Sequence, residues 1–186
     1  MNENLIILFH GFGDTKKSYE TLAKNMKLPQ TAVLVANGTQ RVPDWLVPEG
    51  YSWFNSIIPG LEDSFNLNIF FKIFFFEVFS TNATTSEIDK ITKQWVGIIN
   101  NLVEKYSFKY QNIFLLGFSQ GATMACLISL SLKKKLGGLI CISPSCLDIF
   151  YKYHKFELKN LQIPIYFSHG ILDDKITTTE AKKNVC

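Results

Sequence analysis

Five short apolar segments recur along the chain, and each is apolar on both sides of an extended strand. They are "NLIILF", "TAVLVA", "NIFLLG", "GLICIS" and "IPIYFS", at residues 4–9, 31–36, 112–117, 138–143 and 163–168. Each segment is too short for a helix, and strands that are apolar on both sides are typical of a parallel sheet covered on both faces. The chain is therefore restricted to folds built around a buried, mostly parallel sheet.

Apolar residues with helical spacing lie between the second and third of these segments. Over residues 84–106 they recur at steps of three and four, which predicts one helix with an apolar stripe. Thr84 and Glu87 are spaced as a capping box at its start. A second helix is expected from about Gln120 to Leu132, and the three lysines that follow suit its negative C-terminal end. Strands separated by helices predict an α/β fold with a mostly parallel central sheet flanked by helices.

Length, charge and cysteine content exclude several classes of protein. The 186 residues are 47% hydrophobic, which is enough for one sizeable core, and we expect a single domain over residues 1–186. A net charge of +3 is too small to indicate a nucleic-acid partner. The cysteines form no C-x-x-C pair and no metal-ligand spacing with the histidines, so we expect free thiols in a reducing compartment and no bound metal. The amino-terminal apolar run is short and follows no basic region, which favours a cytoplasmic protein.

The segment "GFSQG", residues 117–121, is the first candidate for chemistry. It matches G-x-S-x-G and lies directly after a predicted strand and directly before a predicted helix, where a nucleophile elbow is found. In such a turn the serine backbone is strained, the hydroxyl is raised above the sheet edge, and the helix N-terminus faces the developing negative charge. The alternative is a Gly/Ser turn that only joins the strand to the helix. We favour Ser119 as a nucleophile.

A second glycine-rich segment, "HGFGD" at residues 10–14, follows the first strand. Acyl transfer needs two N–H donors for the oxyanion, one after the nucleophile and one from the loop after an earlier strand. We therefore assign the backbone N–H groups of Phe12 and Gln120 to an oxyanion hole. The alternative is an ordinary glycine turn that opens a helix. His10 is expected to be a structural, hydrogen-bonding residue.

Four segments in this order, "LFHGFGDT", "GYSWFNSI", "GFSQGATMA" and "IPIYFSHGILDDKI", resemble the phospholipase/carboxylesterase family of α/β-hydrolases, which includes acyl-protein thioesterases and lysophospholipases. The resemblance covers residues 5–176 apart from one segment. It implies the α/β-hydrolase fold, and it puts the acid of a catalytic triad in the turn after a late strand, at Asp173. Asp174 is the alternative if the register differs by one residue, and a solvated helix cap is the alternative to both.

The resemblance also implies a reaction. A serine hydroxyl attacks a carboxylic ester or a thioester, an acyl-enzyme forms, and water releases the acid, with no metal or organic cofactor. The implied partners are a small-molecule ester or an S-acylated protein. Trp53 and Phe54 are assigned to the wall of the acyl pocket, with a place in the core as the alternative. The sequence does not distinguish thioester, lysophospholipid and small-ester substrates.

The histidines depart from the family pattern. The family has its catalytic histidine one strand beyond the acid, and no histidine follows Asp173 here; His10, His154 and His169 are poor substitutes. We expect a C-terminally truncated fold that lacks the last strand and helix and exposes residues 163–168 as a sheet edge. We also expect a nearly inactive chain, because loss of the triad histidine costs on the order of a million-fold in kcat. The alternative function is a non-catalytic remnant that binds acyl groups or partner proteins.

Residues 66–79, "NLNIFFKIFFFEVF", form an apolar insertion relative to the family pattern. The run contains Lys72 and Glu77 and is too short to span a bilayer. Three interpretations stay open: a lid or membrane-touching loop over the acyl site, a buried extra element, or a segment foreign to the mature protein. The first of these predicts contact with a membrane surface and no transmembrane segment.

Overall fold

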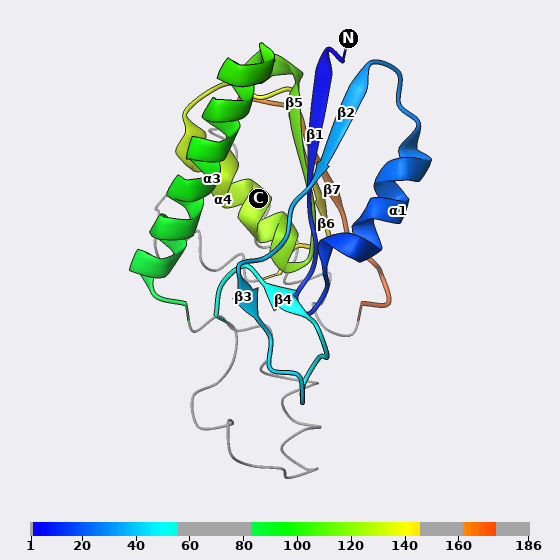
Figure 1. Ribbon diagram of the computed structural model, residues 1–186, viewed down its shortest axis with the longest axis vertical. Helices are drawn as coiled ribbons and strands as arrows, with labels where there is room; N and C mark the ends of the chain where they lie inside the picture. Colours follow the sequence, from blue (N-terminus) through cyan, green and yellow to red (C-terminus); the bar gives the residue numbers. More distant parts are fainter. Residues whose placement is uncertain (1, 56–82, 146–161, 174–186) are drawn as a thin grey trace.

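A parallel sheet of five strands forms the centre of the protein, in the order β2-β1-β5-β6-β7 (Figure 1). The structure is a computed structural model that describes residues 2–55, 83–145 and 162–173. The strands are β1 (Asn4–Phe9), β2 (Thr31–Val35), β5 (Ile113–Phe118), β6 (Gly138–Ile142) and β7 (Ile165–Ser168). Every neighbouring pair in this sheet is parallel, and each strand overlaps one of the five apolar segments. The predicted α/β architecture is confirmed.

Helices cover both faces of the sheet (Figure 1). Helix α1 (Lys16–Met26) lies on one face, and helices α3 (Thr85–Tyr106) and α4 (Gln120–Leu132) lie on the other, with a short 3-10 helix, η2 (Tyr110–Asn112), leading into β5. The helix expected at 84–106 begins one residue later, and α4 has the expected bounds.

The start of α3 realises one half of the predicted capping box. Thr84 is the N-cap, and its hydroxyl oxygen accepts a hydrogen bond from the Glu87 backbone N–H at 3.2 Å. The Glu87 carboxylate accepts hydrogen bonds from the Asn55 backbone N–H, at 3.1 Å, and from the Gln40 side chain. It therefore ties α3 to a distant part of the chain, a role that local spacing does not predict.

Alternation along β1 divides the core into two layers. Ile7 and Phe9 face α3 and α4, where Phe9 packs edge to face on Trp53 and Trp95, with ring centroids 5.2 and 4.9 Å apart. Leu8 belongs to a smaller cluster on the opposite face, which α1 covers. A strand segment that is buried on both faces has to be apolar at every position, as β1 is from Leu5 to Phe9.

A small antiparallel hairpin of β3 (Gln40–Arg41) and β4 (Tyr51–Ser52) lies beyond the carboxyl end of the sheet (Figure 1). Strands of two residues carry no periodicity, so the sequence did not predict the hairpin. An isolated bridge between Asp14 and Tyr51 connects it to the loop that follows β1.

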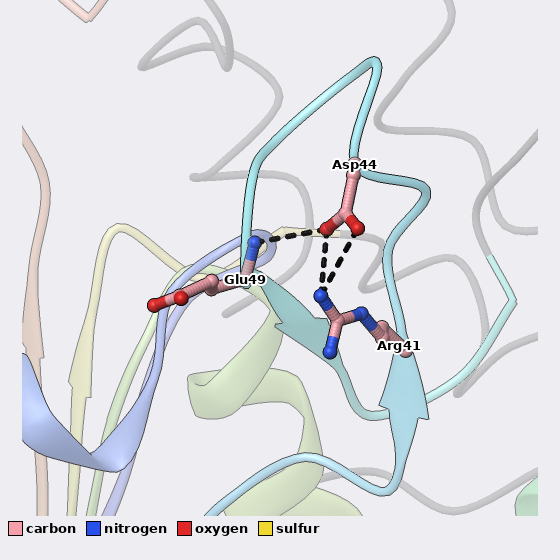
Figure 2. Close-up of polar contacts among 3 residues, drawn as sticks. All are labelled: Arg41, Asp44 and Glu49. Carbon is pink, nitrogen blue, oxygen red and sulfur yellow. Dashed lines mark hydrogen bonds and ion pairs between the residues drawn. The ribbon is translucent and has the colours of Figure 1, made fainter.

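The loop of the hairpin is closed by polar contacts around Asp44 (Figure 2). The Asp44 carboxylate accepts hydrogen bonds from Arg41 Nη2, at 2.8 and 3.1 Å, and from the Glu49 backbone N–H at 3.1 Å. The Arg41 guanidinium holds the pKa of Asp44 below its ordinary value. The closed loop presents Val47 to Gly13, where an added Cβ would lie 3.1 Å from the valine. The hairpin therefore packs against the 10–14 loop.

Some of the features singled out in the sequence lie outside the part of the chain that the structure describes, and one expectation concerned membranes. The apolar insertion at 66–79, His154 and Asp174 lie outside the described residues. Among the helices of the described residues, none has both the length and the apolar character needed to cross a bilayer.

Candidate active site

Ser119 lies at a sharp turn between β5 and α4. Its backbone has φ 51° and ψ −120°, a combination that non-glycine residues adopt only where the surrounding structure enforces it. Two hydrogen bonds do so: the Ser119 N–H donates to the Ile142 carbonyl at 2.9 Å, and the Ser119 carbonyl accepts from the Ala122 N–H at 3.0 Å. The turn has the strand–serine–helix geometry of a nucleophile elbow.

The glycines on either side of the serine are required by close backbone contacts. A Cβ on Gly117 would lie 2.3 Å from the Gly121 carbonyl oxygen, and a Cβ on Gly121 would lie 2.3 Å from the Phe9 carbonyl oxygen and 2.4 Å from that of His10. Such distances leave no space for a side chain at either position. The G-x-S-x-G spacing is therefore a packing requirement, because it lets α4 begin directly against the end of β1.

The 10–14 loop lies beside the elbow. A Cβ added to Gly11 would stand 3.6 Å from Ser119 Cβ. The Gly13 N–H donates to the Tyr51 carbonyl at 2.9 Å, and the Asp14 N–H donates to the Gly11 carbonyl at 3.3 Å. Within the described part of the chain, the Phe12 N–H has no hydrogen-bond acceptor. The 10–14 loop is thus fixed near the serine by backbone hydrogen bonds of Gly13 and Asp14.

Gln120 occupies the first position of α4, where N–H groups point out of the helix end toward any developing anion. Its side chain is 2% exposed and bonds two neighbouring residues. Oε1 accepts from the Trp53 backbone N–H at 2.9 Å, and Nε2 donates to the Phe54 carbonyl at 3.2 Å. The Trp53 and Phe54 side chains have no exposed surface and belong to the core. Their place in the wall of a substrate pocket stays a prediction.

His10 is buried, and both of its ring nitrogens are engaged. Nε2 accepts from the Gly38 N–H at 2.9 Å, so the ring hydrogen is on Nδ1, which lies 2.7 Å from the Gly11 carbonyl oxygen. Burial lowers the pKa of His10, so the ring is neutral in the folded protein. His10 is therefore a structural residue, as expected from its position in the sequence.

Asp173 lies in the turn after β7, at the same edge of the sheet as Ser119. The register pairs Phe118 of β5 with Ile142 of β6, and Ile142 with Ser168 of β7. One strand, β6, therefore lies between Ser119 and the turn after β7. Neighbouring strands are about 4.8 Å apart, so this arrangement puts the two segments roughly 10 Å apart. Asp173 Oδ2 lies 3.7 Å from Nε2 of His169. The two proposed triad members thus come from the carboxyl ends of strands in one sheet.

A further contact of the elbow was not predicted. The Ser145 N–H lies 3.4 Å from the Ser119 carbonyl oxygen, and the Thr123 hydroxyl donates to the Ser145 carbonyl. These bonds attach the loop after β6 to the elbow. The hint in the sequence was Thr123, one of a few polar residues in a helix that is largely apolar and buried.

A strained serine between a parallel strand and a helix, with a glycine loop beside it, is the mark of an α/β-hydrolase. Comparison with known families agrees and is more specific. The chain belongs to the phospholipase/carboxylesterase family, whose sequence model matches residues 1–66 and 70–185. The family resemblance noted in the sequence is confirmed.

Relatives and solved structures extend this result. An uncharacterised hydrolase of Schizosaccharomyces pombe is 29% identical over 166 residues, which are 88% of this chain and 60% of the relative. Acyl-protein thioesterase 1 of Saccharomyces cerevisiae is 28% identical over 184 residues, which cover 90% of this chain and 69% of that protein. The crystal structure of esterase PE8 superposes with a TM-score of 0.70 at 21% identity, covering 97% of this chain and 74% of the other. The chain spans 60% and 50% of the lengths of two uncharacterised fungal hydrolases that it matches.

Proposed function

We propose that the protein is a serine hydrolase of carboxylic esters or thioesters, with Ser119 as its nucleophile. The conformation of Ser119 carries this proposal, because a serine is held at φ 51° and ψ −120° between β5 and α4 at a structural cost. The Ser119 hydroxyl attacks the acyl carbon, the alcohol or thiol leaves, and water then releases the acid from the acyl-serine. This chemistry requires no metal and no organic cofactor.

The oxyanion of the tetrahedral intermediate is stabilised by the backbone N–H groups of Phe12 and Gln120. Support comes from the closeness of Gly11 to Ser119 and from the position of Gln120 at the start of α4. One donor comes from the loop after the first strand and the other from the residue after the nucleophile, as the chemistry of acyl transfer on this fold requires.

Asp173 is the acid of the triad. The rate of turnover depends on which histidine acts as the general base. His10 has both ring nitrogens engaged, His169 contacts Asp173 in its own turn, and His154 lies outside the described residues. We expect the 186-residue polypeptide to acylate slowly, since removing the base costs about a million-fold in kcat while the oxyanion hole retains a residual 10³–10⁴-fold rate enhancement over water.

The substrate is a small-molecule ester or an S-acylated protein. One relative supports this class by name, acyl-protein thioesterase 1 of Saccharomyces cerevisiae. Phe118 supports it physically, because this large apolar residue directly precedes Ser119 and is 42% exposed, which suits contact with an acyl chain. Contact of the protein with a membrane surface and the absence of a nucleic-acid partner belong to the same proposal.

A cytoplasmic location is supported by two thiols. Cys126 and Cys141 are buried with their sulfur atoms 3.3 Å apart, and both are free. Such a pair persists as thiols in a reducing compartment.

The test combines a nucleophile variant with rescue by a small base. Hydrolysis of p-nitrophenyl butyrate is measured with the wild-type chain and Ser119→Ala, with and without added imidazole, which supplies a general base from solution. We expect wild type to exceed the variant, and imidazole to widen that difference at least tenfold beyond its own uncatalysed effect. Equal rates for the two proteins under both conditions contradict the proposal and favour the non-catalytic remnant.

A further inference from the structure

Three separate segments of the chain meet around Ser119 through buried hydrogen bonds. They are the N-terminal end of α4, residues 53 and 54 after β4, and the 10–14 loop after β1. The side chains that join them, Gln120, Trp53 and His10, are each at most 2% exposed. A polar group at that depth keeps a fixed partner, because breaking the bond leaves it without water.

The carboxamide of Gln120 forms the first link. It accepts from the Trp53 N–H at 2.9 Å and donates to the Phe54 carbonyl at 3.2 Å, so both ends of one amide hold two consecutive residues. A neutral amide both donates and accepts hydrogen bonds, and an asparagine side chain is one methylene shorter.

Trp53 forms the second link. Its indole Nε1–H donates to the His10 carbonyl at 2.7 Å, and its ring lies 4.9 Å from the His10 ring, centroid to centroid. The same carbonyl is approached from another side by Gly121, where an added Cβ would lie 2.4 Å from it. His10, the first residue of the 10–14 loop that contains Phe12, is thus held between the Trp53 indole and the first turn of α4.

We infer that the Gln120 side chain is a positioning group, which fixes the distance between the two oxyanion donors through Trp53 and His10. The inference deepens the proposed function and rests on it. The donors belong to different segments, the Phe12 loop and the start of α4, and a misplacement of about 1 Å in such a site costs up to a hundredfold in rate. The Gln120 carboxamide joins these segments through the buried residues Trp53 and His10.

The test measures the rate at which a fluorophosphonate modifies Ser119, by intact-protein mass spectrometry between pH 5 and 8 in imidazole buffer. Gln120→Met has nearly the same length but neither hydrogen bond, and we expect it to react roughly 10- to 100-fold more slowly at every pH. Ser129→Ala is the matched control, since Ser129 is also a buried polar residue of α4, bonded to the Ala125 carbonyl at 2.8 Å. It should react within twofold of wild type.

Gln120→Glu separates positioning from general damage to the fold. An ionised carboxylate cannot donate to the Phe54 carbonyl, whereas a protonated one donates and accepts as the amide does. The ratio of its rate to that of wild type should therefore rise toward one as the pH falls through the pKa of the new carboxyl group. A purely structural role gives a ratio that does not change with pH. The indole N–H resonance of Trp53 reports in parallel whether the network is intact.

The outcomes distinguish the two proposals. A wild-type chain that is not modified at Ser119 overturns the proposed function and this inference with it. A wild-type chain that is modified, together with a Gln120→Met variant that reacts within twofold of it, overturns the inference alone. If Gln120→Met does not fold, the pH dependence of Gln120→Glu decides the question.

Discussion

Ser119 is the residue in which backbone strain and the proposed chemistry coincide. Holding a non-glycine residue at φ 51° and ψ −120° costs about 1–3 kcal/mol. Glycine adopts such angles freely, so we expect Ser119→Gly to raise the free energy of unfolding by about 1 kcal/mol while it abolishes phosphonate modification. Thermal unfolding followed by circular dichroism checks this, since 1 kcal/mol corresponds to about 2–4 °C in Tm for a chain of this size.

Ser119→Ala is the control for that prediction. It removes the same hydroxyl but retains a Cβ in the strained conformation, so it should lose modification without the gain in Tm. Equal Tm values for the two variants would mean that the elbow stores no strain.

At the scale of elements, the junction of β1 and α4 depends on Gly121. An added Cβ would lie 2.3 and 2.4 Å from two carbonyl oxygens of the β1 end, so Gly121→Ala has to move the helix. We expect a loss of about 3 kcal/mol or more in the free energy of unfolding, measured in urea, and loss of modification at Ser119.

Gly97→Ala is the matched control for this junction. Gly97 lies within α3, and a Cβ there would meet nothing within 4 Å. The free energy of unfolding of this variant should therefore be about 0.5–1 kcal/mol higher than that of wild type, because alanine replaces glycine inside a helix. A Gly121→Ala variant as stable as Gly97→Ala would contradict the close packing of α4 on β1.

Elements with periodicity were predictable, and contacts between distant segments were not. The bounds of β1 and α4 agree with the sequence because each is a nearly continuous buried segment, of six and thirteen residues, and α3 begins within one residue of its periodic pattern. The β3–β4 hairpin was missed because two-residue strands carry no pattern. In the site, G-x-S-x-G placed Ser119 from local geometry, whereas the Gln120 contact with Trp53 joins residues 67 positions apart and has no local signal.

At the scale of the whole molecule, the sheet sets the layout and buried polar groups connect the loops at its carboxyl edge. His10 is the titratable member of that network, since its Nε2 fixes Gly38 and its carbonyl holds Trp53. The stability of the whole fold should therefore depend on the protonation of one buried ring.

The direction of that dependence follows from burial, which lowers the pKa of His10 from its ordinary value of 6.5. Between the lowered value and 6.5, the unfolded chain binds a proton that the folded protein does not. The contribution of His10 is therefore complete above pH 6.5 and is lost as the pH falls below it, at up to about 1.4 kcal/mol per pH unit.

Urea unfolding from pH 8 to 5 should show this loss in wild type. His10→Gln keeps an acceptor for the Gly38 N–H but does not titrate. Its free energy of unfolding should therefore fall less steeply with decreasing pH than that of wild type, by the slope given above. Parallel curves would show that the His10 ring takes up its proton as readily in the folded protein as in the unfolded chain, and would remove it from the neutral network around Ser119.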